Sequence, residues 1–215
     1  MALGKSGVFL AGAFLLVATA GGAEESDVSV SREMVSREGH RLLFTVKPPK
    51  GRSVDPRVFD LFELDEGSDG QAMTMEAGRK HKVSEPQDTE ALDLSGHTIR
   101  IEAVAMANSC SIKTATVKYK KSTLRGSGFV TVDAVGAASI YVGVYPVSGD
   151  VDAYTSSGTD RTPCSQSIKN AGQFDLARCY VSDCNTSGNV LSGYVDNPQS
   201  SSVQWVGAVT VAFAR

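Results

Sequence analysis

The chain has 215 residues, of which 21 are Lys or Arg and 24 are Asp or Glu, and its formal net charge is −3. A net charge this close to zero argues against nucleic-acid binding, which needs a strongly basic surface to neutralise phosphates. A chain of this length forms either one large domain or two small ones.

The first 23 residues have the features of a secretory signal peptide. Lys5 precedes an unbroken apolar run from Val8 to Val17, and small residues follow as far as Ala23. The run is shorter than the roughly 20 apolar residues that a bilayer-spanning helix needs. We therefore expect a cleaved leader over 1–23, no transmembrane segment after its removal, and a mature protein that is secreted or periplasmic.

The charge distribution divides the rest of the chain into two regions. Residues 1–125 contain 17 basic and 17 acidic residues, whereas residues 126–215 contain 4 and 7 and have no glutamate. The change occurs at "KKSTLRGSG". It predicts a charged, β-rich N-terminal region over 24–125 and a Gly/Ser/Thr-rich sandwich region over 126–215, which are two domains or two parts of one sandwich.

Strand signals in the N-terminal region flank a long polar segment. "HRLLFTVKPP" predicts a strand closed by Pro48 and Pro49, because proline has no N–H for a ladder hydrogen bond. "RVFDLFEL" fits a strand or a helical turn, and "HTIRIEAVAM" and "SIKTATVKYK" predict two more strands. Residues 65–96 are rich in charge, Gly and Ser, and we expect a long loop there. The Val-Ser-Arg-Glu repeat at Val30 and Val35 fits no regular element, so it is treated as incidental.

The C-terminal region has the clearer β pattern. "GFVTVDAV", "ASIYVGVYPV" and "SVQWVGAVTVAFA" are rich in β-branched and aromatic residues, and turn residues separate them. In the last of these, the two-residue period of a strand favours Trp205 as a core anchor. The same period places these residues on its face: Val203, Gly207, Val209, Val211 and Phe213. No sustained helical pattern follows the leader, so the expected fold class is all-β, an antiparallel β-sandwich that forms one domain or two.

The cysteine content also fits an exported protein. The four cysteines are Cys110, Cys164, Cys179 and Cys184. An even number in an exported chain predicts two disulfides. We expect one bridge within 164–184 and a second that ties Cys110 to that segment. Zinc is disfavoured because no Cys-x-x-Cys pair occurs.

Two aspartates in "SGDVDAYTSSGTD" form a candidate cation site. Asp150 and Asp152 lie two residues apart, on the strand face that also carries Tyr154. Calcium takes six to eight oxygen ligands and would relieve the repulsion between the two carboxylates, so Ca²⁺ is the candidate cofactor. The other candidate ligands are Asp160, Asp175 and Asp183. The favoured alternative is a polar turn, in which Gly149 turns the chain and an aspartate caps backbone amides.

The same stretch resembles a known family. "YVGVYPVSGDVDAYTSSG", residues 141–158, is similar to the core of the bacterial pre-peptidase C-terminal domain, in which a strand runs into a Gly-Asp-x-Asp-Leu-Tyr segment. Gly149, Asp150, Asp152 and Tyr154 match that segment, and the similarity extends over about 112–213. The resemblance implies a non-catalytic β-sandwich domain of secreted proteins, often appended to proteases, that aids secretion or binds polymers.

Aromatic and basic residues supply further candidate binding groups. In "IYVGVY", Tyr141 and Tyr145 flank Gly143 on one strand face and could form a flat shelf for a sugar ring or a peptide. Alternatively, the rings are half-buried with their hydroxyls in water. Lys118 and Lys120 share a face in a basic stretch that could bind a polyanion, although lysines on an edge strand also prevent edge-to-edge pairing.

Together these features predict a secreted or periplasmic, non-catalytic binding or accessory protein. Its ligand is a glycan, a surface polymer or a protein, and the candidate ligand-binding residues are Tyr141, Tyr145 and Tyr154. One alternative is a protease inhibitor or escort protein that acts through the 65–96 loop.

A small hydrolase is the weaker alternative. Its candidate groups are Asp150, Asp152 and the three histidines, His40, His81 and His97. The sequence has neither an HExxH metal pair nor a GxSxG nucleophile motif, which lowers the expectation of catalysis.

Overall fold

The computed structural model describes residues 28–35, 41–64, 90–104, 112–158, 162–180 and 188–214. Nearly all regular structure in these ranges is β-strand, with one short 3-10 helix, η1, at Pro56–Leu61. The strands are β1 Val30–Val35, β2 Arg41–Lys47, β3 Phe62–Glu63, β4 Leu92–Asp93, β5 Thr98–Val104, β6 Ile112–Leu124, β7 Phe129–Val135, β8 Ala137–Ser148, β9 Val151–Ser157, β10 Thr162–Lys169, β11 Asp175–Tyr180, β12 Val190–Asp196 and β13 Val203–Ala214.

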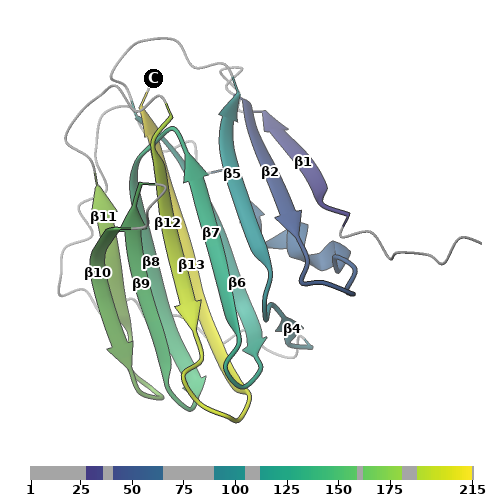
Figure 1. Ribbon diagram of the computed structural model, residues 1–215, viewed down its shortest axis with the longest axis vertical. Coiled ribbons are helices and arrows are strands. Elements are labelled where there is room, and N and C mark those ends of the chain that lie inside the picture. Colours follow the sequence, from purple (N-terminus) through teal and green to yellow (C-terminus); the bar gives the residue numbers. More distant parts are fainter. Residues whose placement is uncertain are drawn as a thin grey trace, which may run out of the picture.

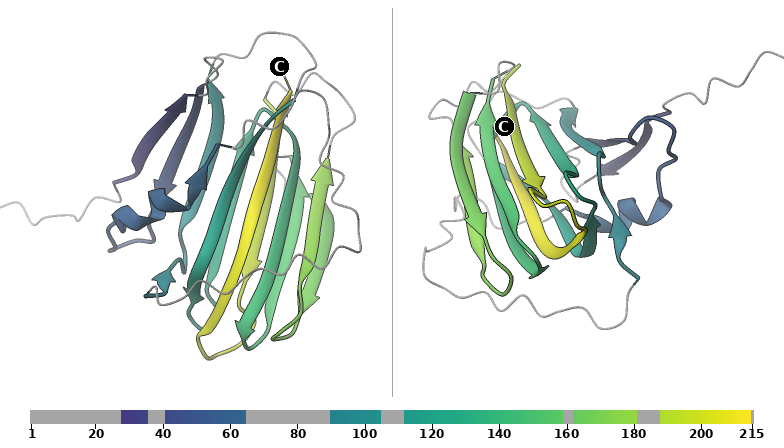
Figure 2. Two further views of the ribbon diagram at one scale, coloured as in Figure 1. Left: turned by 180° about the vertical axis from the view of Figure 1, so that it is seen from behind. Right: turned by 60° about the horizontal axis from the view of Figure 1, so that its bottom comes forward.

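The strands form two sheets that pack face to face (Figures 1 and 2). The first sheet has the order β1-β2-β5-β7-β12-β9-β10, and the second has the order β11-β8-β13-β6-β3, with β4 beside β6. Pairing is antiparallel except between β5 and β7 and between β4 and β6. The predicted all-β sandwich is confirmed.

The apolar core lies between the two sheets, and Trp205 is its largest fully buried side chain. The Trp205 ring lies 4.7 Å, centroid to centroid, from the buried ring of Tyr119. The predicted face of β13 is confirmed for most of its members, which lie in the core: Val203, Trp205, Val209, Val211 and Phe213. Gly207 follows a register shift in the pairing with β6, and a β-carbon there would lie 2.3 Å from the Gly143 carbonyl oxygen.

Residues from both sides of the charge boundary contribute to both sheets. The N-terminal strand β5 pairs with β7 in the first sheet, and β6 pairs with the C-terminal strand β13 in the second. One continuous apolar cluster contains buried side chains of both regions. In the described residues, the two regions are therefore parts of one sandwich.

The strands predicted from the sequence appear as β2, β5, β6, β7, β8 and β13. "RVFDLFEL" forms η1 followed by β3, and the Asp55 side chain caps η1 by accepting a hydrogen bond from the Arg57 N–H. Val30–Val35, interpreted as incidental, forms the edge strand β1. Among the residues expected as a loop, 65–89 lie outside the described ranges, and Leu92–Asp93 forms β4. No helix in the described ranges is long and apolar enough to span a membrane.

Candidate binding surface

Alternation along β8 points its two tyrosines away from the core. Ile140, Val142 and Val144 are fully buried between the sheets. The intervening residues therefore lie on the outer face of the second sheet, because successive side chains of a strand point to opposite faces. Tyr141 and Tyr145 are both half-buried there. The prediction that they share a face is confirmed.

The space above Gly143 is occupied by a third aromatic ring. A β-carbon at Gly143 would lie 3.2 and 3.3 Å from two ring carbons of Phe174 and 3.7 Å from a methyl carbon of Leu176. The missing side chain of Gly143 thus makes room for Phe174, which sequence analysis did not select. Tyr141, Phe174 and Tyr145 form a row along β8 that we call the aromatic strip. Its outer members are about 13 Å apart, because they lie four residues apart along the strand.

The strip has different neighbours on its two sides. On the β11 side, Arg178 lies directly opposite Tyr141, and Tyr180 is 67% exposed. On the β13 side the strip borders short side chains, since Thr210 pairs with Tyr141 and Ala208 with Gly143. At Tyr145 the β13 partner is Val206, which is buried, so short side chains border the strip only beside Tyr141 and Gly143.

Tyr154 lies on the other outer face of the sandwich. It belongs to β9 in the first sheet, where its neighbours Val151 and Ala153 point into the core. Its ring stacks on that of Tyr194, its cross-strand partner in β12, with a centroid distance of 4.6 Å and an interplanar angle of 13°. Tyr154 therefore does not join Tyr141 and Tyr145 in one binding surface.

Asp150 lies in the connection that carries the chain from the second sheet to the first. Gly149 adopts the left-handed φ of 71° that a tight turn often requires. The Gln199 side-chain amide donates a hydrogen bond of 3.0 Å to the Asp150 carboxylate. These contacts favour the turn interpretation of the Gly149–Asp150 segment.

Asp152 faces a second carboxylate across the first sheet. It lies in β9, directly opposite Asp196 of β12. Burial raises the pKa of Asp152, and the negative charges of Asp196 and Asp150 raise it further. Burial also raises the pKa of Asp196, against a smaller opposing effect of its hydrogen bond with the Asn197 backbone. The pair therefore favours protonation more than an isolated aspartate would.

In the described ranges, no group of three or more His, Cys, Asp or Glu residues is placed to hold a metal. No third residue of these types therefore joins Asp150 and Asp152 there as a calcium ligand. Asp175 is engaged elsewhere: it forms an ion pair of 2.7 Å with Lys169 and accepts a hydrogen bond from Ser167. Asp160 and Asp183 lie outside the described residues. Calcium at Asp150 and Asp152 stays a prediction.

A disulfide joins the two sheets at one edge of the sandwich. Cys164 of β10 is bonded to Cys179 of β11, so the bridge predicted within 164–184 is confirmed. Cys110 and Cys184 lie outside the described residues, and their pairing stays a prediction.

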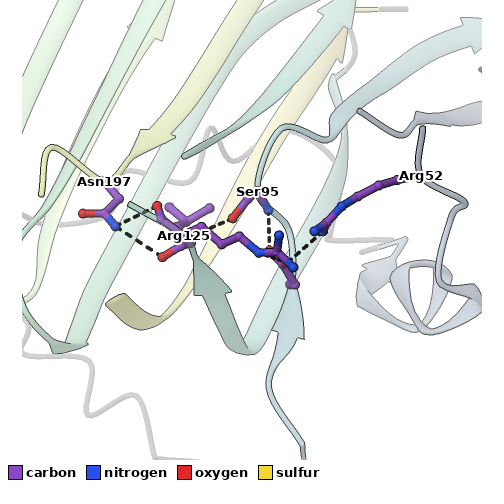
Figure 3. A network of polar contacts seen from close by, with 6 residues as sticks. Arg52, Ser95, Arg125 and Asn197 are labelled. Carbon is purple, nitrogen blue, oxygen red and sulfur yellow. Dashed lines mark hydrogen bonds and ion pairs between the residues drawn. The ribbon is translucent and has the colours of Figure 1, made fainter. Parts of the chain in front are cut away.

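A polar network fixes the boundary between the two sequence regions, as Figure 3 shows. The Asp93 carboxylate accepts a 2.9 Å hydrogen bond from Arg52 and forms a 2.8 Å ion pair with Arg125. Burial alone would raise the pKa of Asp93, but hydrogen bonds from Arg52 and Ser95 and the charge of Arg125 hold it below its usual value. The buried Asn197 amide donates to the carbonyl oxygen of Arg125 at 2.8 Å. Arg125, which directly follows β6, is thus a structural residue.

His97 is the only histidine among the described residues, and it is 3% exposed. Neither of its ring nitrogens has a hydrogen-bond partner in the described structure, and burial lowers the pKa of the imidazole. So buried a ring is not available as a general base to a substrate at the surface. His40 and His81 lie outside the described residues.

Comparison with known proteins does not identify a family. No known protein family and no curated protein matches the chain. The solved structures that it resembles include the cupin domain of Schizosaccharomyces pombe Cnp3, at 6% identity and a TM-score of 0.25, over 85% of this chain and 86% of that one.

Two further matches are to Drosophila melanogaster CENP-C. Its cupin domain matches at 8% identity and a TM-score of 0.22, over 54% of this chain and 67% of that one. CENP-C bound to CAL1 matches at 9% identity and a TM-score of 0.24, over 54% and 71%. TM-scores this low carry no argument about function, and the resemblance to the pre-peptidase C-terminal domain stays a prediction.

Proposed function

We propose that the protein is an exported, non-catalytic binding or accessory module that recognises a glycan or other surface polymer through the aromatic strip. The observation that supports this most directly is the row of three half-buried rings, Tyr141, Phe174 and Tyr145, on an outer sheet face. Aromatic rings offer flat apolar area, and tyrosine adds a hydroxyl that can form hydrogen bonds. A sugar ring presents the same combination of an apolar face and a polar rim.

The shape of the surface favours an extended ligand. The strip runs along β8 for about 13 Å, and short side chains such as Ala208 and Thr210 border it on β13. A linear polymer can follow the strand and contact all three rings at once.

Export is supported by two independent features. The first 23 residues have the pattern of a signal peptide, and Cys164 and Cys179 form a disulfide. Disulfides persist mainly in oxidising compartments such as the periplasm and the extracellular space. A module that binds surface polymers would act in those compartments.

The proposal is tested by measuring the binding of the mature protein to a panel of polysaccharides. Each of Tyr141→Ala and Tyr145→Ala should weaken binding by about tenfold, because each removes one stacking contact of about 1.4 kcal/mol. Phe129→Ala is the matched control, since Phe129 is an exposed ring on the first sheet.

Binding that depends equally on Phe129 and Tyr141 would contradict the assignment of the site. If a peptide library supplies the only ligands that depend on the strip, the surface binds protein and the glycan proposal is wrong.

A further inference from the structure

The aromatic strip lies between cationic side chains. On β11, β8, β13 and β6, the described residues that point outward from the second sheet include the basic Arg178, Lys118 and Lys120 and no acidic residue. The neighbouring β3 contributes Glu63, which forms an ion pair with Lys118. This face is basic although the whole chain has a net charge of −3.

The strand register places these charges on both sides of the strip. Arg178 is the direct cross-strand partner of Tyr141, so their backbones are about 5 Å apart. Lys118 lies opposite Ala208, which in turn lies opposite Gly143, so Lys118 is about 10 Å from the strip in the same row. Arg178 is exposed and forms no ion pair with any described residue, which leaves its guanidinium free to bind a ligand.

The chemistry of these side chains selects a class of ligand. A guanidinium matches a carboxylate with two parallel hydrogen bonds, which an ammonium group cannot do. An aromatic ring beside that guanidinium would contact the apolar face of the sugar that carries the carboxylate. Sugars with a carboxylate at the ring, repeated along a linear chain, would meet both requirements at once.

Resting on the proposed function, we infer that this face binds a linear polysaccharide of carboxylate-bearing sugars. The sugar rings stack on the aromatic strip, and Arg178 binds a carboxylate of the sugar above Tyr141. Lys120 contributes longer-range attraction from the β6 side, and Lys118 contributes less because it is paired with Glu63.

Polygalacturonate and its methyl ester are suitable probes, because esterification removes the carboxylate charge and keeps the sugar backbone. Alginate serves as a second acidic polymer. We expect the mature protein to bind at least one of the two acidic polymers. If polygalacturonate is its ligand, the ester should bind at least tenfold more weakly.

Arg178→Gln should weaken binding to the acidic polymer about tenfold and leave any residual binding to the ester unchanged. Arg100→Gln, at an exposed arginine of the first sheet, is the matched control.

The outcomes separate this inference from the proposed function. If ester and acid bind equally and only Tyr141→Ala reduces binding, the charge inference is wrong and the proposed function stands. If no polysaccharide binds in a strip-dependent way, both are wrong. A single-stranded oligonucleotide that binds as tightly as the acidic polymer, and no longer binds in Arg178→Gln, would also overturn the inference. The face would then recognise negative charge without recognising the sugar that carries a carboxylate. Unchanged melting temperatures of the variants would exclude unfolding as the cause of any loss.

Discussion

Both outer faces of the sandwich carry tyrosines, but a pair on the first sheet and a pair on the second sheet are arranged differently. On the first sheet, Tyr154 and Tyr194 are cross-strand partners and stack on each other, and Tyr194 is only 5% exposed. On the second sheet, Tyr141 and Tyr145 lie four residues apart on one strand, too far apart to stack on each other, and both are half-buried. Tyrosines on adjacent strands cover one another, whereas tyrosines along one strand leave ring surface for a ligand.

The two faces also differ in charge. Around β9 and β12, the first sheet presents Asp152 and Asp196 side by side. The second sheet presents Arg178 on one side of the aromatic strip, and on the other side it presents Lys120 and Lys118, the latter paired with Glu63. The first face is therefore a packed surface with an unfavourable carboxylate pair, and the second combines partly exposed rings with positive charge.

The largest effect that would test this contrast is the loss of stability in Tyr194→Ala. Removing a buried ring leaves a cavity, so the free energy of unfolding should fall by about 4 kcal/mol. Tyr141→Ala should cost less than about 1 kcal/mol, because its ring is partly exposed. Urea denaturation measures both values, and Tyr194→Phe is the control that keeps the ring. Equal losses in the two alanine variants would mean that both faces are packed for stability.

The disulfide should have the next largest effect, because it joins the edges of the two sheets. Its cysteines are 15 residues apart, and closing a loop of that length stabilises a fold by about 3 kcal/mol. We expect the double variant Cys164→Ser/Cys179→Ser to unfold at a correspondingly lower urea concentration. Arg178 directly precedes Cys179, so binding of acidic polymers should weaken as well. An unchanged denaturation midpoint would show that the bridge does not form in the native protein.

The sequence predicted those strands whose own residue pattern indicates β-structure without reference to neighbouring strands. The central strand β13 alternates apolar and small residues over most of its length, so its core face and Trp205 were predicted correctly. No strand was predicted over β10, β11 or β12, because their Ser, Gly, Asp and Arg residues obscure the alternation, and pairing with neighbours determines their structure.

The candidate binding surface was also predicted only as far as the residue pattern of a single strand allows. Alternation placed Tyr141 and Tyr145 on one face, which is a property of a single strand. It could not show that the chain changes sheets at Gly149–Asp150, so Tyr154 was grouped with them although it lies on the opposite face. Phe174 precedes β11 and has no strand pattern of its own, and the only signal of its position was the glycine at Gly143.

The smallest predicted effect concerns the carboxylate pair of the first sheet. The pKa of Asp152 is raised from its ordinary value of 3.8, first by burial and then by the charges of Asp196 and Asp150. The folded state therefore loses stability relative to the unfolded state as the pH rises through this raised pKa, and below pH 3.8 the full stability is present. Asp152→Asn should raise the melting temperature slightly at pH 7 and leave it unchanged at pH 3. Asp133→Asn is the control, because its carboxylate accepts a 2.6 Å hydrogen bond from Ser192 and has no carboxylate as its cross-strand partner.

The same variant decides between repulsion and a cation at this position. A calcium ion held by Asp150 and Asp152 would stabilise only the folded state, so added CaCl₂ would raise the melting temperature of the wild type. Asp152→Asn would then lower the melting temperature at pH 7 in the presence of calcium, which is the opposite of the effect expected from repulsion alone. The sign of the shift at pH 7, measured with calcium and with a chelator, therefore separates a carboxylate pair that destabilises the first sheet from one that holds a metal.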